Sequence, residues 1–198
     1  MKKWMTLLLV LGIALTLSAK NEYIGQNAYH NDGGQINIAA DAVLVIRDLK
    51  SPYTPFYLFL GAEKDTKADI DRDSIILVHN GQEHKMPSLA ELRSSYNRDT
   101  RDLGTYQWMG KQALITSKLR GYDFRNTVDF FPGRTDSMTG TQEGSISGNI
   151  GFFTRVYFKN PGFEEGDIIT IKVQDKNDPS ISGSVEIILT DRWGEKEK

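Results

Sequence analysis

Apolar and polar residues alternate through the last third of the chain. The segments 151–159, 167–173 and 184–190 each carry apolar residues at every second position, as at Ile169 and Ile171. Because side chains alternate between the two faces of a strand, this period of two predicts half-buried strands. No helical pattern separates these segments, which favours antiparallel pairing over a parallel sheet.

Short apolar runs separated by turn residues continue this pattern toward the N-terminus. The further expected strands cover residues 35–39, 42–47, 56–61, 74–79 and 127–131. Residues 20–34 are polar without a sustained period, so we expect a flexible lead-in that ends at Gly33-Gly34. Residues 97–125 give no firm prediction. The polar, glycine-rich segment 134–149 is expected to be a loop.

Two local motifs predict a hairpin followed by a helix. Asn80-Gly81 lies between two extended runs and predicts a two-residue type I′ turn, because both turn positions need a positive φ. In that register His79 faces Gln82. Ser88 and Glu91 then form a capping box, which predicts one short helix over residues 89–96.

Together these elements predict an all-β fold. The three C-terminal strands, with the turn-rich segment Asn160-Pro161-Gly162-Phe163-Glu164-Glu165-Gly166-Asp167 before the second, resemble the bacterial immunoglobulin-like sandwich class. The resemblance covers roughly the last 50 residues. We therefore expect an antiparallel immunoglobulin-like β-sandwich, with one inserted helix, over residues 35–192. A charged tail is expected over 193–198.

The first residues have the order of a secretory signal. Lys2 and Lys3 precede an apolar run from Leu7 to Leu17, and the small residues Ser18 and Ala19 follow it. The run has 11 residues, whereas a helix needs about 20 to cross a bilayer. We expect cleavage after Ala19, although Leu17 is large for its position before the cut, and a periplasmic or secreted protein.

Composition excludes several classes of function. The 198 residues contain 24 basic and 26 acidic side chains, and loss of residues 1–19 with their two lysines leaves a net charge of −4. A mildly acidic chain without a basic run is a poor binder of nucleic acid or anionic membrane surfaces. The absence of cysteine excludes disulfides, thiolate zinc sites and cysteine nucleophiles.

One acidic segment is a candidate metal site. Asp69, Asp71 and Asp73 alternate, so an extended backbone projects three carboxylates to one side, and oxygen ligands suit Ca²⁺. A helix-loop-helix calcium loop would need glycine where Ser74 stands and glutamate where Asn80 stands. We expect a solvated acidic loop and keep calcium binding as the alternative. No other cofactor is expected.

Four aromatic residues are candidate ligand contacts, because they lie near predicted loops. Tyr106 and Trp108 belong to one segment, and Phe130 and Phe131 precede Pro132. Rings exposed side by side would stack on a sugar or bind a partner protein; otherwise they anchor loops in the core. His79 and His84 share one hairpin face but lack a third ligand, so we interpret them as ordinary strand residues.

No motif activates a nucleophile. In Gly144-Ser145-Ile146-Ser147-Gly148 an isoleucine stands at the position of the serine in a nucleophile elbow. We therefore predict no enzyme but an exported, non-catalytic binding or structural module, with a protein or a glycan of the envelope as its partner. Two alternatives are a calcium-stabilised accessory module and a small hydrolase whose site is assembled only in space.

Overall fold

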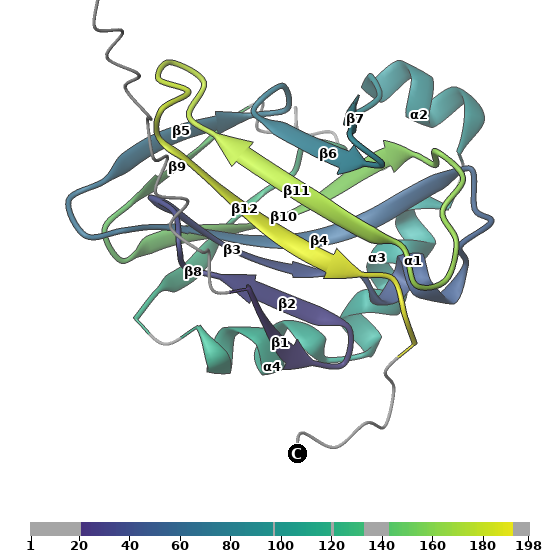
Figure 1. Ribbon diagram of the computed structural model, residues 1–198, viewed down its shortest axis with the longest axis horizontal. Helices are drawn as coiled ribbons and strands as arrows, with labels where there is room; N and C mark the ends of the chain where they lie inside the picture. Colours follow the sequence, from purple (N-terminus) through teal and green to yellow (C-terminus); the bar gives the residue numbers. More distant parts are fainter. Residues whose placement is uncertain (1–20, 97, 120, 133–142, 192–198) are drawn as a thin grey trace, which may run out of the picture.

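The computed structural model describes residues 21–96, 98–119, 121–132 and 143–191 (Figure 1). In this part of the chain 46% of residues lie in strands and 18% in helices, so the fold is mostly β. The expected signal segment 1–19 and charged tail 193–198 lie outside the described residues. Within them, no helix combines the length and apolar character needed to cross a membrane.

The strands form two sheets. The larger has the order β1-β2-β3-β4-β10-β9-β5, and β8 pairs with β10 in parallel. Its members are β1 (Asn21–Gly25), β2 (Ala28–Asn31), β3 (Ile36–Asp41), β4 (Tyr53–Ala62), β5 (Lys67–Asp71), β8 (Asp123–Val128), β9 (Glu143–Ser147) and β10 (Ile150–Lys159). Apart from the β8–β10 pair, all described pairings are antiparallel.

The smaller sheet contains the predicted hairpin and has the order β12-β11-β6-β7. Its members are β6 (Ile75–His79), β7 (Gln82–Lys85), β11 (Ile168–Gln174) and β12 (Ser182–Ile188). The turn residues Asn80 and Gly81 have φ values of 50° and 75°, and His79 pairs with Gln82. The predicted hairpin and its register are therefore confirmed.

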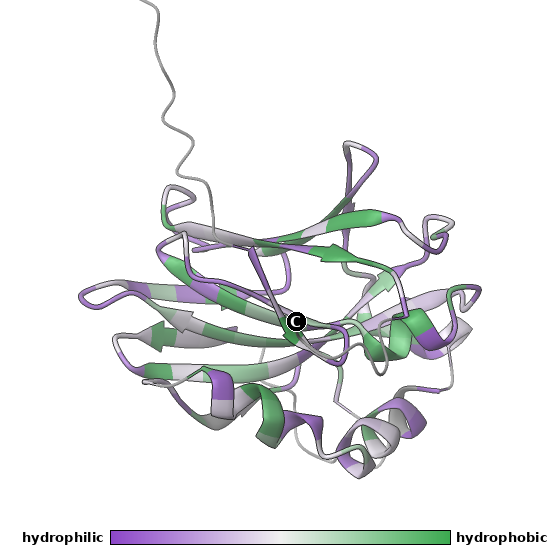
Figure 2. Cartoon of the chain, turned by 60° about the horizontal axis from the view of Figure 1, so that its bottom comes forward, coloured by the Kyte–Doolittle hydropathy of each residue, from purple (hydrophilic) through white to green (hydrophobic). Residues whose placement is uncertain are grey.

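α3 and α4 cover the face of the larger sheet opposite the smaller one, so the molecule has three layers, whereas α2 packs at the edge of the core between the sheets (Figure 2). The helices are α1 (Val43–Arg47), α2 (Leu89–Ser95), α3 (Asp99–Trp108) and α4 (Lys111–Lys118). Ser88 caps α2 by accepting a hydrogen bond from the Glu91 N–H at 3.0 Å, which confirms the predicted capped helix. The expectation of a single helix is wrong.

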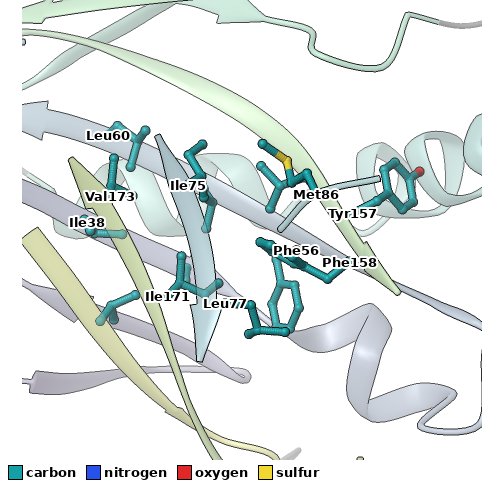
Figure 3. Packing of buried hydrophobic residues seen from close by; sticks show 14 of the residues in the cluster. Ile38, Phe56, Leu60, Ile75, Leu77, Met86, Tyr157, Phe158, Ile171 and Val173 are labelled. Carbon is teal, nitrogen blue, oxygen red and sulfur yellow. The ribbon is translucent and has the colours of Figure 1, made fainter. Parts of the chain in front are cut away.

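Alternate residues of the central strands enter two separate cores. Phe56 and Leu58 of β4 pack with Leu77 and Ile171 between the two sheets (Figure 3). Tyr57, between them in the sequence, joins a second core beneath the helices. β10, which pairs with β4, is likewise buried on both faces. The prediction of a half-buried strand over 151–159 is therefore wrong.

Several predicted boundaries also differ from the structure. The strand expected at 42–47 is wrong, because residues 43–47 form α1. The Val43 N–H donates a hydrogen bond to the Asp41 carboxylate at 2.9 Å. An unbroken apolar run does not distinguish a buried helix from a strand. The expected lead-in contains β1 and β2, so the sheet domain begins by Asn21. The strand expected at 127–131 lies at 123–128 as β8. The expected loop 134–149 contains β9, while its residues 134–142 lie outside the described part.

Candidate functional site

The structure does not bring the four candidate aromatic residues onto one exposed surface. The ring of Tyr106 is buried and stacks on Tyr57, with ring centroids 3.5 Å apart. Phe130 and Phe131 are also buried, in the core between the sheets. Trp108 is 85% exposed at the end of α3. Three of the four rings are therefore core residues, and Trp108 alone is accessible to a ligand.

The three candidate metal ligands serve different local contacts. The Asp69 carboxylate accepts a hydrogen bond from Ser145 at 2.6 Å, and the Asp71 carboxylate accepts one from the Ser74 hydroxyl at 2.9 Å. Asp73, in the following turn, lies 3.6 Å from the Lys85 ammonium group. In the described residues no group of three or more histidine, aspartate or glutamate side chains is arranged to hold a metal ion.

His79 is a buried strand residue. Its Nε2 atom lies 2.9 Å from the Asp167 carboxylate, and its ring meets Phe163 edge to face. These contacts connect the β6–β7 hairpin to the segment before β11. The arrangement stabilises a loop and leaves the ring 6% exposed, which is unfavourable for proton transfer to a ligand.

A groove of about 570 Å³ lies over the outer face of the smaller sheet. Its described lining contains hydroxyl, amide, charged and small apolar groups. The lining residues are Asn31, Gly33, Gly34, Ser74, Ile76, Glu83, Lys172, Val173, Gln174, Pro179, Ser182, Gly183 and Ser184. The surface is rich in hydrogen-bond donors and acceptors, and none of these residues is aromatic or a histidine.

The alternating pattern of the strands builds the floor of the groove. Ile76, Lys172 and Ser184 point away from the core, whereas their neighbours Leu77 and Ile171 point into it. Lys172 of β11 and Glu83 of β7 form an ion pair of 3.2 Å across β6, the strand between them. The alternating sequence pattern predicts which residues of these strands point outward. It does not predict that the β2–β3 loop packs beside them.

Glycines form the end of the groove near the β2–β3 loop. A Cβ atom on Gly34 would lie 2.7 Å from the carbonyl oxygen of Ser182, and one on Gly183 would overlap the carbonyl group of Ile36. Only glycine permits this close approach of the two backbones. The loop therefore rests directly against the start of β12 and closes one side of the groove.

Comparison with known proteins identifies no relative. No protein-family model matches the chain, and no match was found among curated proteins or solved structures.

Proposed function

We propose that this chain is an exported, non-catalytic binding module of the cell envelope or the extracellular space. The observation that carries the proposal is the groove over the smaller sheet, whose described lining offers many hydrogen-bonding groups and no histidine next to a nucleophile. A rigid sheet with loops at its ends is a common platform for recognition. The secretory pattern of residues 1–19 supports export.

Within this proposal the two packed sheets are a variant of the immunoglobulin-like sandwich. The antiparallel smaller sheet and its packing over the larger one support this assignment. The helical layer over the other face of the larger sheet is an addition to a two-layer sandwich.

The groove favours an extended protein segment as the ligand. The glycines and serines leave room for a backbone, and the hydroxyl and amide groups can satisfy its polar atoms. A sugar ring would gain from stacking on an aromatic face, and no described lining residue provides one. We therefore place the partner among envelope or extracellular proteins.

Photo-cross-linking in living cells tests this function. A photoreactive residue at Gln174, inside the groove, should give a discrete protein adduct, whereas one at Thr170 should not, because Thr170 lies on the same sheet face outside the groove lining. Ser184→Arg, which fills the groove, should abolish the adduct, and Thr170→Arg should preserve it. Adducts of equal strength from both positions would contradict the proposal.

Two further measurements separate the alternatives. Cosedimentation with purified cell-wall sacculi that is lost in Ser184→Arg would indicate a glycan instead of a protein ligand. Turnover of a panel of chromogenic ester, glycoside and peptide substrates would indicate a hydrolase. For export, we expect the mass of the protein recovered outside the cytoplasm to lack residues 1–19.

A further inference from the structure

A second concave site lies on the helical side of the molecule, away from the groove. It is a cleft of about 260 Å³ between the end of α1 and the beginning of α3, which lie side by side in Figure 1. Its described lining is rich in arginine. The lining residues are Leu44, Arg47, Asp48, Ser51, Pro55, Tyr96, Arg98, Arg101, Asp102 and Thr105.

We propose that this cleft binds a small oxyanion, a phosphate or a carboxylate group, through the guanidinium groups of Arg47, Arg98 and Arg101. Guanidinium groups are planar and present several N–H donors in a geometry that matches such anions. Arg47 belongs to α1, whereas Arg98 and Arg101 belong to the beginning of α3, so the fold brings the three guanidinium groups together.

Arg98 and Arg101 keep donors for a ligand. Arg98 uses Nη1 to bind the Asp48 carboxylate at 2.8 Å, but its buried Nε atom has no acceptor among the described residues. Arg101 is exposed and forms no ion pair within the described part of the chain. The exposed guanidinium donors of Arg101, and those of the Arg98 side chain, which is 40% exposed, are therefore accessible to an oxyanion in the cleft.

Ser51 adds a neutral group to the same wall. Only 6% of the residue is exposed, and its hydroxyl oxygen is buried. A side-chain interaction with Ser51 lowers the pKa of Tyr96 against the larger effect of burial, so the two hydroxyl groups lie close together. Ser51 therefore adds a hydroxyl group beside that of Tyr96 to the cleft lining.

The two carboxylates of the cleft do not cancel its positive charge. Asp48 is paired with Arg98. Asp102 is buried and accepts hydrogen bonds from the hydroxyl groups of Tyr96 at 2.7 Å and Tyr157 at 3.4 Å. Burial raises the pKa of Asp102 above its ordinary value. The described lining thus has three arginines and two aspartates, a net charge of +1, on a chain that is acidic as a whole.

The first turn of α3 faces the same region. Its N-cap residue, Arg98, makes no side-chain hydrogen bond to the turn, and the first N–H groups of a helix have no partner within the helix. This positive helix end reinforces the guanidinium groups, which carry the site. The size of the cleft limits the ligand to a small molecule or the terminal group of a larger one.

Titration of the purified protein with sodium phosphate, followed by amide chemical shifts in NMR spectra, tests the site. Ionic strength is held constant with sodium chloride, and sodium acetate forms a separate arm. We expect saturable shift changes confined to residues 47–51 and 98–105. A response to phosphate alone assigns a phosphoryl ligand, a response to acetate alone assigns a carboxylate, and a response to both assigns a general oxyanion site.

Two variants with the same change in charge complete the experiment. Arg101→Gln should weaken anion binding about tenfold, as expected for one charge-assisted hydrogen bond. Lys50→Gln removes an exposed charge close to Arg47 but outside the cleft lining, and should leave the affinity within about twofold. Circular dichroism checks that both variants are folded. Shifts that grow without saturation, or equal weakening in both variants, would show only an ionic-strength effect and overturn the proposal.

Discussion

The ammonium group of Lys111 lies 3.0 Å from the carboxylate of Asp41, and both side chains are buried beneath α4. Lys111 also donates to the carbonyl oxygen of Gln26 in the β1–β2 turn. Burial lowers the pKa of Lys111 and raises that of Asp41, while each group favours the charged form of the other. The pair fixes the start of α4 to the end of β3 and to the first hairpin.

Removing one member of this pair should therefore be costly. We expect Lys111→Met to lower the free energy of unfolding by about 3–5 kcal/mol, because it leaves Asp41 buried without its partner. Urea denaturation measures the change. The double variant Lys111→Met/Asp41→Asn should recover part of the loss, and Lys50→Met, an exposed lysine, should have little effect. A loss in the double variant equal to the sum of both single losses would show that the two groups are not coupled.

Gly183 should be among the least replaceable residues of the chain. A methyl group there would overlap the Ile36 carbonyl group, so Gly183→Ala must push β12 away from β3. We expect the free energy of unfolding to fall by about 1–3 kcal/mol, as measured by thermal or urea denaturation. Gly104→Ala is the matched control, because no atom lies within 4 Å of its added Cβ and the residue is helical. That change should be neutral or stabilise by up to about 1 kcal/mol.

The sequence predicts the smaller sheet well, because local signals determine it. Asn80-Gly81 specifies both the turn and the register of β6 and β7. In β11, Ile169 and Ile171 are buried and Lys172 is exposed, as the alternation predicts for a sheet with one solvated face.

The larger sheet is harder to predict, because its central strands β3, β4 and β10 are buried on both faces. A strand such as β4 has no polar face, and its apolar run resembles that of α1, whose residues 43–47 we predicted as a strand. One face of these strands is covered by α3 and α4. These two helices have weak amphipathic patterns, so the sequence does not show that they cover a sheet. The cleft lined by Arg47, Arg98 and Arg101 was equally unpredictable from the sequence, because its residues in α1 and α3 lie about 50 positions apart in the chain.

Tyr106 and Trp108 lie two residues apart in α3, but their substitution should change stability by very different amounts. Tyr106→Ala removes a buried ring that stacks on Tyr57, and we expect a loss of about 3–5 kcal/mol in unfolding free energy. Trp108→Ser removes an exposed ring and should change stability by less than about 0.5 kcal/mol. A large loss from Trp108→Ser would show that this ring is covered in solution, for example by a second molecule.

Calcium should have little effect on stability if the acidic segment is only a solvated loop. Asp69 and Asp71 are held by Ser145 and Ser74, and Asp73 lies apart in the turn. We therefore expect the melting temperature in millimolar calcium to equal that in a chelator. A calcium concentration 100-fold above a dissociation constant would stabilise the protein by about 2.7 kcal/mol. A clear rise that disappears in Asp71→Asn would restore the calcium-stabilised alternative.

Asp175 ties the edge strand β5 to the turn between β11 and β12. Its carboxylate accepts hydrogen bonds from the backbone N–H groups of Asp69 at 2.6 Å, Asn177 at 2.7 Å and Asp178 at 2.6 Å. Burial alone would raise the pKa of Asp175, but these backbone donors and Lys176 outweigh it, so its pKa lies below the ordinary value of 3.8. The ionised carboxylate is therefore stabilised more in the folded than in the unfolded chain.

This direction of the pKa shift fixes the pH dependence of stability. A carboxyl group with a lowered pKa in the folded state contributes stability that is fully present above its unfolded pKa and is lost as the pH falls through its folded pKa. We expect Asp175→Asn to be less stable than the parent by about 1–3 kcal/mol in urea denaturation near neutral pH, because a hydrogen-bonded charge is removed. Below the ordinary value of 3.8 the two proteins should converge.

Asp178→Asn is the matched control. Asp178 also accepts a hydrogen bond, from the Ser180 N–H at 3.0 Å, but it is a surface residue of the same turn, so its substitution should show a smaller difference. A stability difference for Asp175→Asn that stays constant from neutral to acidic pH would mean that its charge does not contribute, and that the turn depends only on the shape of the side chain.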